Sequence, residues 1–131
     1  MNLKRQINIE GLKIKLDFRL NCTTTNIIYL AMCKHCDPPG NFYFGQTINS
    51  CRARNNGHRD KFSIENETYR KSALSYHIYD KHIEHFDNKL YNYDIGIIKQ
   101  VHPNSLDRAE DYFVHMTKAD IISINRYKVI K

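Results

Sequence analysis

The chain has 131 residues, enough for one domain with a modest hydrophobic core. Its composition, 41% hydrophobic and 11% aromatic, is that of a folded globular protein and excludes a disordered chain. The formal net charge of +6 suits a polyanion such as nucleic acid, although a basic surface that merely keeps the protein soluble would have the same charge.

The sequence also bears on the compartment. No apolar run approaches the roughly 20 residues that a membrane helix needs, so we expect no membrane partner. The amino terminus lacks the continuous apolar stretch of a secretory signal, and we expect an intracellular protein, nuclear or cytoplasmic. In a reducing compartment, cysteines are better explained as metal ligands or buried thiols than as disulfides. Cys33 and Cys36 have the C-x-x-C spacing of metal ligands, whereas Cys22 and Cys51 are isolated.

Apolar residues at every second position predict β-strands, because successive side chains of a strand face opposite sides of a sheet. The segments with this pattern, or with β-branched and aromatic runs, are residues 7–9, 12–20, 27–32, 42–47 and 91–101. The first two can form a hairpin or two consecutive strands, and the next two can form a hairpin across a loop with two prolines and a glycine. Residues 121–130 close the chain as a short strand or an extended tail.

Helical spacing appears in three places. Residues 48–62 are polar and basic, Ser72 can cap a second helix, and Ser105 can cap a third that runs to about residue 118. Residues 65–71 are predicted to be an exposed loop. The fold class that follows is α+β, with a central antiparallel sheet of three core strands flanked by helices. The amino-terminal segment would add one or two edge strands, or a hairpin, outside these three core strands.

Five side chains from separate segments could together carry phosphodiester chemistry: Tyr29, Tyr43, Arg54, His58 and Glu110. The two tyrosines lie on strands of one predicted hairpin, which can bring them onto one face of a sheet. The arginine and the histidine are four residues apart and share a helical face. A glutamate is a hard oxygen ligand for Mg²⁺, a guanidinium offsets charge on a phosphate, and a histidine or tyrosine can orient or deprotonate water.

Each of these residues has a simpler explanation when taken alone. A strand tyrosine usually packs in the core, and an arginine or glutamate on a helix is usually solvated. Asn125, which lies between two apolar stretches, is more often a turn or cap residue than a site residue. Only the ordered occurrence of the whole set favours a site.

The set falls in a series of short motifs that resembles the GIY-YIG nuclease family. IIY at Ile27–Tyr29 and YFG at Tyr43–Gly45 are similar to the two tyrosine motifs of that family. CRARNNGH resembles its Arg-x-x-x-His helix, LDRAEDYFV its metal-binding glutamate helix, and SIN the asparagine segment near the end of its core. Two departures, Ile27 for the first glycine and Phe44 for an isoleucine, occupy apolar strand positions. We expect them to change packing and not chemistry.

The resemblance implies one domain over residues 1–131, with an amino-terminal β extension (1–25) and a nuclease core (26–125). It implies hydrolysis of DNA with one divalent cation, Mg²⁺ or Mn²⁺. The positions that it assigns to the site are Tyr29, Tyr43, Arg54, His58, Glu110 and Asn125. The first tyrosine would position or activate water and the second would support it, while the arginine would hold the scissile phosphate. The histidine would assist proton transfer, the glutamate would hold the metal, and the asparagine would buttress the site by hydrogen bonding.

A second set of candidate residues consists of two cysteines and two histidines. Cys33 and Cys36 lie between the two tyrosine motifs, and His77 and His82 follow in SALSYHIYDKH. A C-x-x-C turn and two histidines can close a tetrahedral structural zinc site. The combination resembles the endonuclease domains of Penelope-like retroelements, which sit beside a reverse transcriptase and nick target DNA.

The identity of the two non-cysteine ligands stays open. The chain has seven histidines, so His35 and His85 compete for the site, and Cys22 could replace a histidine. A four-ligand zinc site has no open position, and its role would be folding stability. Its loss is expected to unfold the hairpin loop before it affects chemistry.

Three other functions are compatible with these residues. One is a zinc-stabilised nucleic-acid-binding module without hydrolysis, which would not need Tyr29, Arg54 and Glu110 together. Another is a branch-specific DNA repair nuclease of the same fold, and the third is a structural zinc domain for protein interaction. The resemblance implies DNA as the partner, together with a linked reverse transcriptase or another DNA-binding domain, because nucleases of the family often delegate sequence specificity to other domains.

Overall fold

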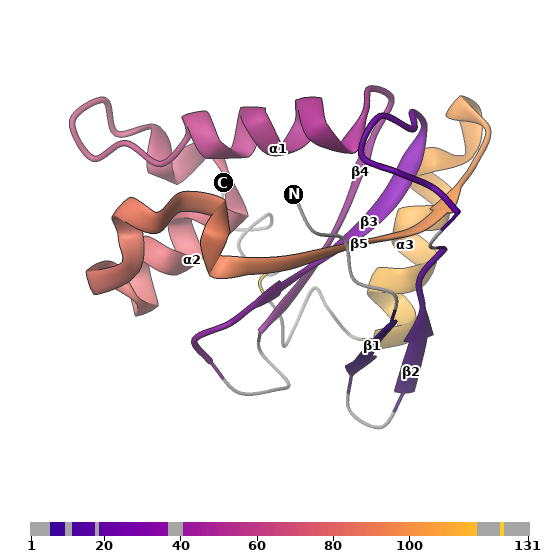
Figure 1. The fold of residues 1–131 in the computed structure, drawn as a ribbon, viewed down its shortest axis with the longest axis horizontal. Coiled ribbons are helices and arrows are strands. Elements are labelled where there is room, and N and C mark those ends of the chain that lie inside the picture. Colours follow the sequence, from indigo (N-terminus) through magenta and orange to yellow (C-terminus); the bar gives the residue numbers. More distant parts are fainter. Residues whose placement is uncertain (1–5, 10–11, 18, 37–40, 118–123, 125–131) are drawn as a thin grey trace.

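The strand from Ile27 to Cys33 is the middle of the sheet around which the chain folds. The computed structural model describes residues 6–9, 12–17, 19–36, 41–117 and 124. Within these residues the chain is α+β, with a three-stranded antiparallel sheet in the order β4-β3-β5 and a separate two-stranded sheet (Figure 1). The strands are β1 (Gln6–Ile9), β2 (Leu12–Lys15), β3 (Ile27–Cys33), β4 (Phe42–Thr47) and β5 (Tyr93–Gln100). The α-helices are α1 (Cys51–Asp60), α2 (Ala73–Lys81) and α3 (Leu106–Thr117).

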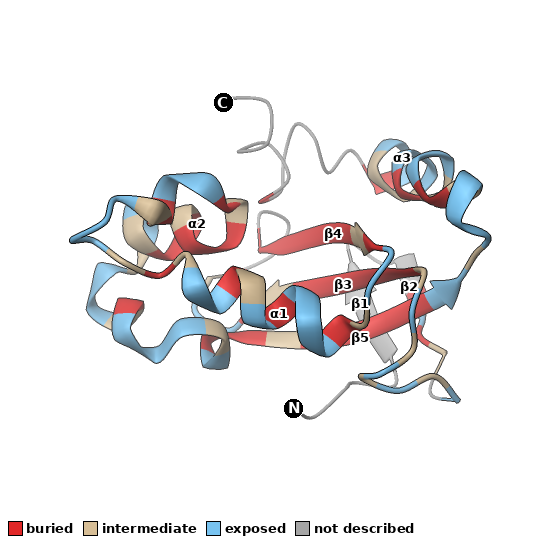
Figure 2. Cartoon of the chain, turned by 90° about the horizontal axis from the view of Figure 1, so that it is seen from above, coloured by how far each residue is buried: buried red, intermediate tan, exposed pale blue. Residues whose placement is uncertain are grey.

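Strand β3 is buried on both faces, as expected of a central strand. Ile27, Tyr29 and Ala31 belong to one hydrophobic cluster, whereas Ile28 and Leu30 belong to a second. This alternation follows from the period of two along a strand. The first cluster includes residues of α1 and α2, and the second includes residues of β2 and α3, so helices cover both faces of the sheet (Figure 2).

The amino-terminal segment forms the predicted hairpin, but within the described residues this hairpin adds no edge strand to the main sheet. Strands β1 and β2 pair only with each other, and β2 ends at Lys15 instead of continuing to residue 20. The segment after it is nevertheless anchored, because the Asp17 N–H donates to the Ile97 carbonyl over 2.8 Å. Leu16 also packs against Gly96, whose missing Cβ leaves room for the leucine side chain.

The helices begin close to the predicted positions, but two details differ. Helix α1 is capped by Ser50, whose hydroxyl accepts from the Ala53 N–H at 3.1 Å. The expected exposed loop at 65–71 contains a 3-10 helix (Thr68–Lys71) with Tyr69 buried. Ser72 precedes α2, yet its side chain makes no capping hydrogen bond there. Further 3-10 segments span Ile83–Asn92 and Pro103–Ser105.

The predicted strand or tail at 121–130 lies outside the described residues, apart from Ile124, which is buried in the first cluster. Within the described ranges, no helix combines the length and the apolar character needed to cross a bilayer.

Candidate functional site

The two tyrosines of the short motifs meet on the face of the sheet that α1 covers. In the pairing of β3 with β4, Tyr29 lies opposite Gly45 and Ala31 lies opposite Tyr43. The Tyr29 and Tyr43 ring centroids are 6.2 Å apart. A shift in the pairing of β3 with β5 occurs between Ile28 and Tyr29, and such irregularities often serve to redirect a side chain next to a site.

Gly45 is the position that makes room for Tyr29. A Cβ built at Gly45 would collide with the Tyr29 ring and hydroxyl. We therefore expect Gly45→Ala to push the phenol out of place and to lower the free energy of unfolding by about 1–3 kcal/mol, the usual range for overpacking. Urea unfolding measures the loss of stability. Gly57→Ala is the control, because a Cβ at Gly57 would have no described atom within 4 Å. An equally stable Gly45→Ala protein would contradict this account.

His58 joins the first tyrosine to a serine in a buried chain of hydrogen bonds. The Tyr29 hydroxyl lies 2.7 Å from His58 Nε2, and His58 Nδ1 lies 2.8 Å from the Ser72 hydroxyl. The histidine is 2% exposed, so water does not compete for these nitrogens. The Ser72 hydroxyl is thus bound to an imidazole, which explains why it does not cap α2. A phenol, an imidazole and a hydroxyl in series can pass a proton.

Arg54 places a positive charge beside the phenols. It lies one helical turn before His58 on α1, so both side chains reach the same end of the sheet. Burial lowers the pKa of Arg54, but its electrostatic interaction and hydrogen bonding with Tyr29 and Tyr43 outweigh burial and raise it. The guanidinium therefore stays charged at any pH at which the protein is folded.

Tyr43 is held in its neutral form. Burial and the charge of Glu110 raise its pKa to about 12, against the lowering effect of Arg54 and the Tyr29 hydroxyl. Tyr43 is therefore protonated at neutral pH, where it can donate a hydrogen bond but cannot take a proton from water.

The raised pKa of Tyr43 makes stability depend on alkaline pH. Because the folded pKa of about 12 exceeds the value of about 10 in an unfolded chain, this contribution is complete below pH 10 and is lost as the pH rises through 12. We expect the wild type to lose about 1.4 kcal/mol per pH unit more than Tyr43→Phe in that window. Urea unfolding of both proteins from pH 8 to pH 11 measures the difference. Parallel curves for the two proteins would contradict the raised pKa.

The carboxylate of the site belongs to Glu110, on the helix that covers the other face of the sheet. Glu110 lies on α3, is 8% exposed, and its Oε2 accepts from Gln46 Nε2 at 2.7 Å. The same Gln46 nitrogen donates to Asp107 Oδ1 at 2.6 Å. Because β4 is an edge strand, Gln46 ties α3 to this edge and directs the Glu110 carboxylate toward the phenols.

These side chains meet at one cavity of about 270 Å³ beside β4. Its lining is Tyr43, Gln46, Arg54, His58, Lys71, Ser72, Ala73 and Glu110. Buried phenol, imidazole and carboxylate groups form the inner wall, and the exposed Arg54 and Lys71 stand at its rim. A second hollow of about 380 Å³ shares Gln46 and Arg54 with it. Cations at a rim and an acid inside suit a phosphate bound through a metal ion.

The structure therefore brings Tyr29, Tyr43, Arg54, His58 and Glu110 together, and Asn125 lies outside the described residues. Three polar or charged lining residues were missed in the sequence: Gln46, Lys71 and Ser72. The only available signal for Gln46 was its position directly after the YFG motif. Ser72 carried a signal for a helix cap and none for a histidine partner.

A second cluster lies where β3 ends and α2 approaches it. One ligand atom from each of Cys33, Cys36, His77 and His82 can be chosen so that all four lie within 4.8 Å of one another. Cys36 Sγ and His77 Nε2 are 3.4 Å apart. A tetrahedral zinc ion with bonds of about 2.0–2.3 Å would hold such atoms roughly 3.3–3.8 Å from each other. The cluster can thus hold a metal ion after a small contraction.

The chemistry of the donors fits a metal. Hydrogen bonds from Cys36, His77 and the His35 N–H lower the pKa of the Cys33 thiol against the effect of burial, which favours the thiolate that metals bind. Burial lowers the pKa of His82, which favours the neutral imidazole. The Nε2 atom of His82 is buried and has no hydrogen-bond partner among the described residues, so it can serve as a metal ligand.

The competing ligands are occupied elsewhere. His35 and His85 stack with ring centroids 3.9 Å apart, and His35 Nε2 lies 2.6 Å from the Asn92 side-chain oxygen. They surround the cluster without contributing to it. Cys22 lies near the start of α1, where its sulfur accepts from Arg52 at 3.2 Å, so it does not replace a histidine. Cys51 is buried in the core, as expected of an isolated thiol.

Comparison of the chain with protein-family models, with curated proteins and with solved structures finds no match. The proposed function therefore rests on the geometry of the cavity beside β4 and of the cysteine–histidine cluster.

Proposed function

We propose that this protein is a metal-dependent endonuclease of the GIY-YIG type that hydrolyses phosphodiester bonds in DNA. The observation that carries the proposal is the single cavity that Tyr43, Arg54, His58 and Glu110 share, with Tyr29 bonded to the histidine behind it. These residues come from four separate elements, and core packing alone does not require a buried carboxylate and an arginine beside two phenols.

The proposed roles follow from charge and position. Glu110 would hold Mg²⁺ or Mn²⁺, which supplies charge stabilisation at the leaving oxygen when bound. Arg54, at the rim, would bind the scissile phosphate and offset its growing negative charge. Gln46 would orient the carboxylate through the hydrogen bond of 2.7 Å.

Proton transfer is assigned to the chain from Tyr29 to Ser72. Tyr29 would position the attacking water and take a proton from it on the phenol oxygen, while its own hydroxyl proton passes to His58 Nε2, 2.7 Å away. Ser72 fixes the imidazole through Nδ1 and holds the ring in register with the phenol. Tyr43, neutral because of its raised pKa, would donate a hydrogen bond in support.

We further propose that Cys33, Cys36, His77 and His82 hold a structural zinc ion. Two sulfurs and two imidazole nitrogens at these separations suit zinc, and four protein ligands leave no open position for chemistry. Such a zinc would fasten the end of β3 to α2. This combination supports the likeness to endonuclease domains of retroelements, in which a linked reverse transcriptase or other DNA-binding domain would direct the nuclease to its target.

Incubation of the purified protein with supercoiled plasmid tests the nuclease proposal. With Mg²⁺ we expect conversion to the nicked circle, and without a divalent cation we expect none. A protein that shifts the mobility of the plasmid but never nicks it, in Mg²⁺ or Mn²⁺, would be a binding module and the proposal would fail.

A further inference from the structure

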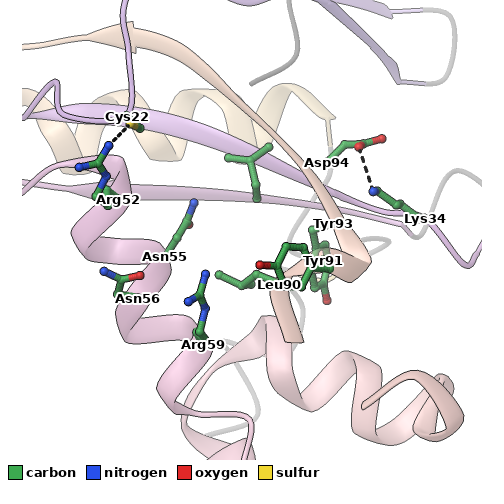
Figure 3. A pocket seen from close by; sticks show the side chains of 11 residues that line it. Cys22, Lys34, Arg52, Asn55, Asn56, Arg59, Leu90, Tyr91, Tyr93 and Asp94 are labelled. Atoms are coloured by element: carbon green, nitrogen blue, oxygen red, sulfur yellow. Dashed lines mark hydrogen bonds and ion pairs between the residues drawn. The ribbon is translucent and has the colours of Figure 1, made fainter. Parts of the chain in front are cut away.

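A groove of about 570 Å³ runs along the flank of α1 that faces away from the catalytic cavity. Arg52, Asn56 and Arg59 form one wall, and Leu90 and Tyr91 stand across from them (Figure 3). On a helix with 3.6 residues per turn, this wall is on the opposite flank from Arg54. The groove is therefore separate from the proposed catalytic site, although the same helix borders both.

The groove has an excess of positive charge. Arg52 and Arg59 are exposed, and within the part of the chain that the structure describes neither forms an ion pair with an acid. Lys34 at the far end is neutralised by Asp94, 3.7 Å away. Two unneutralised guanidinium groups along one helix face attract an anion with more than one charge, since each can bind a phosphate bidentately.

An exposed aromatic ring lies opposite the arginines. Tyr91 is 78% exposed, although it is a large side chain at the edge of a groove. An open ring beside cationic side chains is the arrangement on which unpaired bases stack while the cations follow the backbone.

We propose that this groove binds an unpaired strand of DNA next to the duplex that the catalytic cavity cleaves. Arg52 and Arg59 are about 10 Å apart along the helix axis, which suits successive phosphates of a strand better than one small anion. The volume is of the size that encloses one drug-sized molecule, so a nucleotide or two of a single strand fits inside it, whereas the width of a duplex does not. The inference rests on the proposed function for its choice of DNA and adds a substrate class: duplex with a single-stranded branch.

Binding of a fluorescein-labelled oligothymidine of about 15 nucleotides, followed by anisotropy without Mg²⁺, tests the groove. The double variant Arg52→Gln/Arg59→Gln is expected to bind more than about 10-fold more weakly at 0.1 M salt, with a plot of log K against log salt shallower by about 1.4. Tyr91→Ala is expected to lose about 5-fold or more, and Tyr91→Phe, which keeps the ring, is expected to bind as the wild type does. Lys99→Gln/Arg108→Gln removes two exposed charges outside the groove and is the matched control.

The outcomes separate this inference from the nuclease proposal. Loss of oligothymidine binding in the groove variants, without nicking by any protein, supports the groove and contradicts the nuclease. If the wild type nicks plasmid and the groove variants bind oligothymidine as tightly as the wild type, the groove inference fails and the nuclease proposal stands. An equal loss for a blunt duplex of the same length also overturns it, because the site would then read phosphates of any DNA.

Discussion

Replacement of Glu110 by glutamine is expected to lower Mg²⁺-dependent plasmid nicking at least about 100-fold while the protein stays folded. The carboxylate is the proposed metal ligand, and the charge stabilisation that a bound metal gives the transition state amounts to several kcal/mol. A glutamine has the same shape and can still accept from Gln46 through its amide oxygen, so the tie of 2.7 Å between β4 and α3 can persist. Initial rates of nicked-circle formation at saturating Mg²⁺ measure the effect.

The matched control is Asp111→Asn. Asp111 is the next residue on α3, is exposed, and does not line the cavity. Both variants remove one negative charge from the same helix, so a general electrostatic effect on DNA binding would appear in both. If Glu110→Gln nicks plasmid as fast as Asp111→Asn does, Glu110 is not the metal ligand. Equal mobility shifts of DNA by the two variants would show that DNA binding is intact.

The sequence predicted those features of the fold that follow from local periodicity. The alternation along Ile27–Cys33 indicated a strand, and the structure buries its two sets of side chains in separate clusters. The order of the motifs also indicated which elements lie together in the structure: two strands of a hairpin, the helix after them and the helix after β5. Periodicity identifies the face that a residue occupies, and two polar residues that are buried, His58 and Glu110, line the candidate site.

The rest of the site depends on contacts between distant residues, which local patterns cannot determine. Ser72 has the sequence signature of a helix cap, but it is bonded to His58, 14 residues away. Gln46 reaches Glu110 across 64 positions of the chain, and its own neighbours give no sign of this. The amino-terminal hairpin carries a strand pattern that does not say with which edge it pairs, and it pairs with itself.

The choice among the histidines shows the same limit. His35 lies between the two cysteines in sequence and competed with His77 and His82 as a predicted ligand. Its ring stacks on His85 and its Nε2 lies against the Asn92 side-chain oxygen, while its backbone N–H donates to Cys33 Sγ at 3.4 Å. Spacing alone could identify the C-x-x-C turn, but the direction of each ring depended on the packing of α2 and of the segment Ile83–Asn92 against it.

Cys36→Ser is expected to abolish zinc binding and to lower the melting temperature by more than about 10 °C. Bound zinc stabilises the fold by its binding free energy, so its loss costs several kcal/mol, and each kcal/mol shifts the melting temperature of a domain this size by a few degrees. Mass spectrometry is expected to find about one zinc per wild-type chain and none in the variant. Cys22→Ser, which changes a thiol outside the cluster, is the control and should keep both metal and stability.

The order in which structure is lost separates a zinc that holds the fold from one that acts in chemistry. Without zinc, hydrogen exchange should accelerate first at Cys33 and Lys34, whose N–H groups donate to the Asn41 and Asn92 carbonyls at 2.7 and 2.9 Å. The proposed catalytic cavity is lined by α1, β4, α3 and the first residue of α2, whereas His77 and His82 of the cluster lie further along and after α2, so Cys36→Ser should nick plasmid below its melting temperature. A variant that is folded, with normal exchange at these amides, but inactive would make the zinc part of the reaction and contradict a structural role.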